Sequence, residues 1–262
     1  MPSLLSDQVQ RGRTALVTVA DRGVGRAIAE RLAEAGMTVY LGSSSESAGK
    51  DAERVLRAAG HDVHSVVVDP DDIATIWGAA ERIEWRDGKL DALVNVLGLT
   101  AASSVVRTAD RADDLRAVFD ANVVEAMRVV AVTEALLPLL RRSGSARIVN
   151  VTSAFRPGAR VPARLLSAAD EDGLPEISGG VSPRTTVEML TLQYADVARR
   201  DGVLVSTVCL DAEEGGFGDE SDMSFTLLRA VSVPVGLATL ADDEPTATST
   251  DCSGVRMILL DQ

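Results

Sequence analysis

Residues 14–25 read TALVTVADRGVG, and their pattern indicates the class of fold. Its first half is a run of apolar and β-branched residues, which is typical of a strand buried on both faces. Two glycines follow, and Val24, Ile28 and Leu32 then recur at the spacing of one helix face. Glycines in such a turn let the backbone approach a phosphate, whose charge is stabilised by the amide groups at the helix N-terminus. The stretch therefore predicts a strand, a phosphate-binding turn and a helix.

The rest of the chain repeats this alternation of short apolar runs and longer helical patterns. The predicted strands are residues 14–19, 38–42, 63–68, 92–97, 147–152, 203–210 and 255–260. Two long helices are predicted at residues 112–141 and 183–200. The alternation favours an α/β fold, a Rossmann-like doubly wound parallel sheet of about seven strands with helices on both faces, in a single domain over residues 1–262. Such sheets bind ligands beyond the carboxyl ends of their strands.

Composition narrows the classes of partner. A formal net charge of -13 opposes the cationic surface that nucleic acid requires. The chain has no run of about 18 apolar residues, and its first residues lack the core of a signal peptide, so we expect a cytoplasmic protein that does not enter a membrane. Two cysteines are too few for a disulfide framework, and neither histidine has neighbours at ligand spacing, so no metal site is predicted.

Further landmarks follow the glycine turn in a fixed order. Asp69 follows the third predicted strand, NVLG occupies residues 95–98, Asn122 lies in the first long helix, and the VTS of residues 151–153 places Ser153 directly after the fifth strand. Together with the turn, these residues resemble the short-chain dehydrogenase/reductase (SDR) family over about the whole chain. Val19 stands where the family's TGxxxGxG motif has its first glycine.

The resemblance implies a nicotinamide cofactor and a set of residues that bind it. These are Arg22, Gly23, Val24, Gly25, Ser44, Asp69, Asn95 and Gly98. Arg22 has the place of a basic residue common in the family's NADPH enzymes, and Ser44 can donate a hydrogen bond to phosphate, so NADP(H) is the expected form. Val19 opposes binding, because a β-branched residue is strained where a turn needs a positive φ angle. Whether the cofactor is bound stays open.

The family's catalytic tyrosine and lysine have no counterparts in this sequence. A phenol has a pKa near 10 and needs a nearby ammonium group to transfer protons at neutral pH. The corresponding helix starts in GGVSPRTTVEMLT, residues 179–191, where Arg184 aligns with the lysine and Gly180 with the tyrosine. A register one residue earlier pairs Pro183 with Gly179 instead. The tyrosines and lysines that the chain does contain are Tyr40, Tyr194, Lys50 and Lys89.

Ser153 and Asn122 remain for chemistry, and the resemblance assigns both to the catalytic site. A serine hydroxyl at a strand end can polarise a carbonyl group by donating a hydrogen bond. Substrate contacts are expected from Phe155, Arg156 and Arg184. A packing role for Ser153 and a solvated position for Arg184 stay open as alternatives.

Three functions are consistent with this pattern. The first is a non-redox enzyme of the cyclase, dehydratase or isomerase type that acts on a carbonyl-containing small molecule, in bacterial secondary metabolism if the arginine-rich and alanine-rich composition is a guide. The second is a non-catalytic SDR-like subunit that pairs with an active homologue. The third is an NADPH-dependent ketoreductase. The two long helices suit a homo-oligomer or a hetero-oligomer with another SDR protein.

Overall fold

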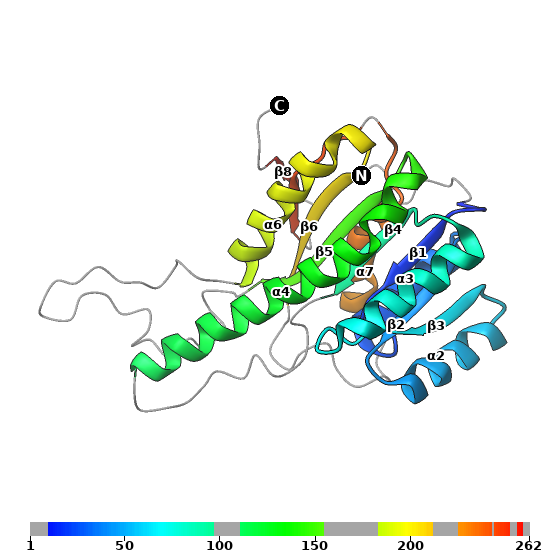
Figure 1. Ribbon diagram of the computed structural model, residues 1–262, viewed down its shortest axis with the longest axis horizontal. Coiled ribbons are helices and arrows are strands. Elements are labelled where there is room, and N and C mark those ends of the chain that lie inside the picture. The colour runs from blue at the N-terminus through cyan, green and yellow to red at the C-terminus, as the bar shows by residue number, and fades with distance from the viewer. Residues whose placement is uncertain are drawn as a thin grey trace, which may run out of the picture.

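The computed structural model describes residues 10–96, 111–154, 183–211, 225–242, 244–251 and 256–258. In these parts of the chain, one twisted sheet lies between two layers of helices (Figure 1). The strand order is β3-β2-β1-β4-β5-β6-β7-β8, and β1 to β7 are parallel. This arrangement confirms the Rossmann-like, doubly wound sheet that the sequence predicts.

The strands at the centre of the sheet are the most deeply buried. The strands are β1 (Thr14–Val17), β2 (Thr38–Ser43), β3 (Val63–Val67), β4 (Ala92–Val96), β5 (Arg147–Ala154), β6 (Leu204–Asp211), β7 (Thr248–Asp251) and β8 (Arg256–Ile258). Every residue of β1 and β4 is buried. Their mostly apolar sequences, TALV and ALVNV, follow from this position, because helices cover both faces of a doubly wound sheet.

The helices divide between the two faces of the sheet. They are α1 (Gly23–Glu34), α2 (Glu46–Ala58), α3 (Ile73–Asp87), α4 (Arg111–Ser143), α6 (Pro183–Ala198), the 3-10 turn η1 (Arg199–Asp201) and α7 (Phe225–Ala238). One hydrophobic core joins the sheet to α1, α2 and α7, and a second joins it to α3, α4 and α6. The two long predicted helices are confirmed as α4 and α6. None of the described helices combines the length and the apolar character needed to cross a membrane.

The last edge of the sheet differs from the sequence prediction. The sequence predicts that the final parallel strand is residues 255–260. In the structure the final parallel strand is β7, and β8, which lies within the predicted range, pairs with β7 in the antiparallel direction. β7 reads TSTD and therefore lacks the apolar run on which the prediction depends. Two of its buried hydroxyl groups donate hydrogen bonds instead, that of Thr248 to Ser206 at 2.9 Å and that of Ser249 to Glu188 at 2.7 Å. The connection through residues 252–255 is too short for the crossover that a parallel pair requires.

Candidate functional site

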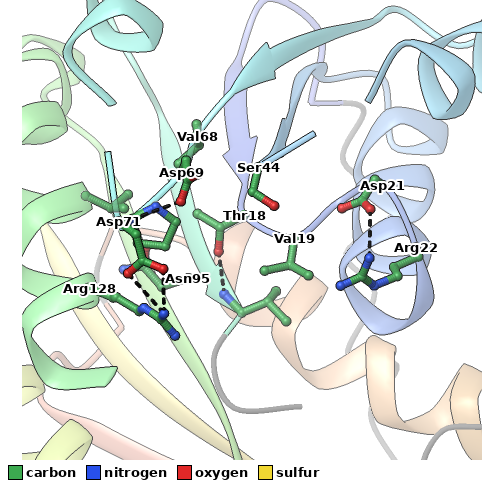
Figure 2. A pocket seen from close by; sticks show the side chains of 13 residues that line it. Thr18, Val19, Asp21, Arg22, Ser44, Val68, Asp69, Asp71, Asn95 and Arg128 are labelled. Carbon is green, nitrogen blue, oxygen red and sulfur yellow. Dashed lines mark hydrogen bonds and ion pairs between the residues drawn. The ribbon is translucent and has the colours of Figure 1, made fainter. Parts of the chain in front are cut away.

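A pocket opens at the carboxyl edge of the sheet, beside β1 and β4. The strand order reverses here, since β2 and β3 extend the sheet beyond β1, and β5 to β8 extend it beyond β4. The segments that follow β1, β2 and β3 line the pocket together with the last two residues of β4 and with α4 (Figure 2). Doubly wound sheets bind their ligands at this switch point.

The turn between β1 and α1 forms one wall of the pocket and is tightly wound. Val19 and Gly23 have φ angles of 53° and 54°, in the left-handed region. A Cβ atom on Gly25 would lie 2.2 Å from the carbonyl oxygen of Val19, so α1 approaches the turn too closely for any side chain. The strain predicted at Val19 is confirmed, and a left-handed β-branched residue costs roughly 1–3 kcal/mol.

Hydrogen bonds from β4 hold this turn in place. The backbone amide of Thr18 donates to the carbonyl oxygen of Val94 at 3.0 Å, and the hydroxyl oxygen of Thr18 accepts from the amide of Val96 at 2.8 Å. The pairing of β1 with β4 therefore continues beyond the end of β1. The position of Val19 at the pocket is fixed by the residue before it.

A chain of buried polar side chains runs from the pocket into the protein. The amide nitrogen Nδ2 of Asn95 donates to Asn150 at 2.9 Å and to Thr133 at 3.3 Å. Asn150 donates in turn to Thr191 at 2.9 Å, and the hydroxyl groups of Thr191 and Thr207 form a hydrogen bond of 2.5 Å. The oxygen Oδ1 of Asn95 has no partner within the described residues. The chain of hydrogen bonds connects β4 with α4, β5, α6 and β6.

Two ion pairs lie on opposite sides of the pocket (Figure 2). On one side, Nη1 of Arg22 lies 3.4 Å from Oδ2 of Asp21, and the Arg22 side chain is 62% exposed. On the other, Nη2 of Arg128 lies 3.0 Å from each carboxylate oxygen of Asp71. Each guanidinium group is thus paired with a carboxylate, and the Arg22 side chain is the more exposed of the two.

Most of the predicted cofactor residues come together here. The predicted residues that line the pocket are Arg22, Ser44, Asp69 and Asn95. Gly23, Val24 and Gly25 begin α1 beside it. The side chain of Val24 is buried in the core that joins α1 to the sheet, so its backbone is the part next to the turn. The predicted residues outside the described parts of the chain are Gly98, Phe155 and Arg156.

Three other predicted site residues are described through their backbone. Asn122 lies in α4, Ser153 in β5 and Arg184 at the second position of α6. Ser153 pairs with Leu210 at the carboxyl end of β5, and the same edge of the sheet carries the pocket. The predicted roles of these residues stay predictions.

Both tyrosines lie outside the residues that line the pocket. The hydroxyl group of Tyr40 donates to Asp87 at 2.5 Å, and that of Tyr194 donates to Glu134 at 2.9 Å. Burial raises the pKa of each phenol, and the neighbouring carboxylate raises it further. Neither lysine lines the pocket. A raised pKa is the opposite of what a proton-transferring phenol needs.

Sequence reasoning missed the wall of the pocket that α4 provides. Arg128 and Val132 lie one helical turn apart on α4, and Asp71 follows β3. Helical period could have placed Arg128 and Val132 on one face of a helix. Nothing in the local pattern shows that this face meets the turn after β3.

A second group of polar side chains lies away from the pocket. Ligand atoms of Glu30, Glu34 and His61 come within 4.8 Å of one another, a meeting that sequence spacing did not indicate. The group is partly exposed, and Glu34 forms an ion pair with Arg31 at 2.7 Å. Surface carboxylates often gather without a metal ion, so the group carries no assignment.

Comparison with known proteins shows the family of this chain. The model of the family described as short chain dehydrogenase matches residues 13–162, more than half of the chain. The protein therefore belongs to the short-chain dehydrogenase/reductase family. The match covers the glycine turn and β1 to β5 and ends before α6.

Individual relatives and structures agree with this class. A short-chain dehydrogenase of Penicillium roqueforti is 36% identical over 142 residues, which are 53% of this chain and 54% of that protein. A 3-oxoacyl-(acyl-carrier-protein) reductase of Salmonella typhimurium is 32% identical over 142 residues, 54% of this chain and 55% of that protein. The chain thus spans about half the length of these relatives.

Solved structures resemble the chain over most of its length. An oxidoreductase of Escherichia coli has a TM-score of 0.71 at 18% identity, covering 96% of this chain and 99% of its own. A metagenomic short-chain oxidoreductase in complex with NADP has a TM-score of 0.64 at 22% identity, covering 92% and 96%. At these identities the likeness shows the fold.

Proposed function

We propose that this protein binds NADP(H) in the pocket and catalyses a non-redox conversion of a carbonyl-containing small molecule, of the cyclase, dehydratase or isomerase type. The observation that carries the proposal is the position of the phenols of Tyr40 and Tyr194. Each lies outside the pocket and donates a hydrogen bond to a carboxylate. The relatives are named as dehydrogenases and reductases, so the non-redox assignment rests on the residues of this chain.

The pocket offers groups that suit a dinucleotide. The first amide groups of a helix have no acceptor within the helix, and Arg22 makes no side-chain cap at the start of α1. Those amides can bind a pyrophosphate. The exposed guanidinium of Arg22 and the hydroxyl of Ser44 suit a 2'-phosphate. The isopropyl group of Val19 and the charge of Asp21 oppose the phosphates, so the expected affinity is low.

A bound nicotinamide ring would supply hydride transfer. Reduction of a carbonyl also needs a proton donor, and neither phenol of this chain lines the pocket. Ser153, at the carboxyl end of β5, is assigned the role of donating a hydrogen bond to the substrate carbonyl oxygen. Polarising a carbonyl in this way also favours enolisation, dehydration and cyclisation. Asn122 is assigned to hold a water molecule, and the substrate contacts are assigned to Phe155, Arg156 and Arg184.

A turnover assay separates the three candidate functions. The protein is incubated with NADPH and a set of ketones and 3-oxoacyl thioesters, while absorbance follows NADPH and mass spectrometry follows the organic compounds. Loss of water or rearrangement without oxidation of NADPH is the expected result. Oxidation of NADPH in step with formation of an alcohol would contradict the proposal and identify a ketoreductase. No conversion, together with co-purification of an active homologue, would favour the non-catalytic subunit.

Substitution of Ser153 tests the assigned chemistry. Ser153→Ala is expected to lower the rate by about 100-fold or more, because it removes a donor aimed at a developing oxyanion. Ser47→Ala, at an exposed position of α2, serves as the matched control and should leave the rate unchanged. Equal rates for both variants would remove Ser153 from the mechanism.

A spectroscopic titration tests the role of the phenols independently of any substrate. Both tyrosines have a raised pKa, so no phenolate absorbance is expected between about pH 7 and pH 10. A phenolate signal near neutral pH would reveal an activated tyrosine and sink the non-redox proposal.

An oligomer is also proposed. Met127 on α4 and Met189 on α6 are 66% and 65% exposed, on two helices that pack against each other. Large exposed apolar side chains on neighbouring elements favour an interface. Light scattering of the protein and of Met127→Glu tests this, with the variant expected to dissociate.

A further inference from the structure

Arg128 forms a wall of the pocket that neither the sequence motifs nor the family comparison assigns to a function. It reaches the pocket from α4, and Asp71 meets it from the turn between β3 and α3 (Figure 2). Nη2 of Arg128 lies 3.0 Å from both carboxylate oxygens of Asp71. The Arg128 side chain is 32% exposed and that of Asp71 is 70% exposed. The ion pair thus holds the end of the guanidinium group at the pocket and offsets its charge.

The surroundings of Arg128 suit an uncharged, flat group. Val68 and Pro70 line the pocket at the end of β3, and Val132 lines it one turn beyond Arg128 on α4. None of the lining residues in the described parts of the chain is aromatic. The guanidinium group is therefore the planar, delocalised surface of this wall. Arginine stacks on the faces of aromatic rings, and bases of every kind offer such a face.

The two ends of the pocket differ in the part of a nucleotide that they suit. Phosphates suit the end with Arg22 and the first amides of α1, where the guanidinium is exposed and backbone donors lie close. A base suits the end with Arg128, because Val68, Pro70 and Val132 also line the pocket and the carboxylate of Asp71 offsets the guanidinium charge. A purine offers a larger face for stacking than a pyrimidine does.

We propose that Arg128 is a specificity-determining residue that stacks on the base of the bound nucleotide and selects purines, and that Asp71 positions it. This inference rests on the proposed binding of NADP(H) in the same pocket. It adds a choice of base, and it assigns a task to a side chain of α4 that the glycine turn does not explain.

Calorimetric titrations with three probes test the stacking. ADP, UDP and inorganic pyrophosphate are titrated into the wild type, Arg128→Lys and Arg128→Ala. The wild type is expected to bind ADP about tenfold more tightly than UDP, because a purine has a larger face than a pyrimidine to stack on the guanidinium group. Both variants should lose this preference and keep their affinity for pyrophosphate within about threefold. Lysine retains the charge and lacks the plane, so a preference that survives in Arg128→Lys overturns the proposal.

Control variants separate stacking from charge and from folding. Arg141→Ala removes another arginine of α4, one that pairs with Asp201 at 2.7 Å outside the pocket, and should leave the preference for ADP intact. Asp71→Asn should reduce the preference and Asp71→Glu should restore part of it. Equal losses of ADP and pyrophosphate affinity in Arg128→Ala would make Arg128 a phosphate contact and overturn the proposal.

The binding measurements distinguish a wrong cofactor assignment from a wrong stacking role for Arg128. A wild-type protein that binds neither NADPH, ADP nor pyrophosphate would refute the proposed cofactor. A wild-type protein that binds all three but treats ADP and UDP alike would refute the stacking role alone. Thermal unfolding of each variant shows whether a change in binding reflects a loss of fold.

Discussion

Replacing Gly25 with alanine tests how closely α1 approaches the turn after β1. The new Cβ atom would lie 2.2 Å from the carbonyl oxygen of Val19, 2.8 Å from its carbonyl carbon and 2.9 Å from the carbonyl oxygen of Thr18. All three are backbone atoms, so no side chain can rotate to make room. The turn cannot shift easily either, because both the backbone amide and the hydroxyl group of Thr18 are hydrogen-bonded to β4.

The expected effect of Gly25→Ala is a large loss of stability. Relief requires α1 and the turn to separate by about 1 Å, and overpacking of this kind costs about 3 kcal/mol. Gly78→Ala is the matched control, because Gly78 is exposed in the middle of α3 and a Cβ atom there meets nothing within 4 Å. Alanine should stabilise that helix by about 0.5–1 kcal/mol.

Urea unfolding followed by far-ultraviolet circular dichroism measures both variants under the same conditions. The two free energies of unfolding should differ by about 4 kcal/mol, with Gly25→Ala the less stable protein. A Gly25→Ala protein within about 0.5 kcal/mol of the wild type would refute the close approach. A Gly78→Ala protein that is clearly destabilised would refute the use of Gly78 as an open helix position.

Three further perturbations test other parts of the structure. Arg147→Met should lower the free energy of unfolding by about 3 kcal/mol, because the buried guanidinium group donates to two backbone carbonyls and to Asp242. Asp242 is exposed, so Asp242→Asn should lower the free energy of unfolding by less than about 1 kcal/mol in the same urea assay. Burial opposes the ionisation of Glu53, but hydrogen bonds led by those from Ser65 outweigh it and lower its pKa, so its stabilisation is present above about pH 4.3 and is lost as the pH falls through the folded value. Glu53→Gln should therefore flatten the acid side of the urea midpoint plotted against pH, and an unchanged slope would contradict this. Val19→Gly should tighten NADPH binding about tenfold in a fluorescence titration, because glycine tolerates a φ angle of 53° and leaves space for phosphate; weaker binding would argue against a blocked turn.

Local pattern was sufficient for most of the fold. The runs that became β1 and β4 are mostly apolar, because both strands are buried on both faces. The strand β7 lacks this apolar pattern, because the hydroxyl groups of Thr248 and Ser249 form hydrogen bonds with neighbouring elements. The antiparallel direction of β8 followed from a short connection that the apolar pattern does not report.

The candidate site divides in the same way. Glycines, Arg22 and Asp69 belong to motifs whose spacing along the chain was readable, and the structure places Arg22 and Asp69 at one pocket. Sequence alone was sufficient for the order of strands β1 to β6, the glycine turn and the strain at Val19. The tertiary structure alone brought Arg128 to Asp71, 57 residues apart in the chain. Periodicity records whether a residue is buried, whereas the partner that it meets depends on how separate elements pack.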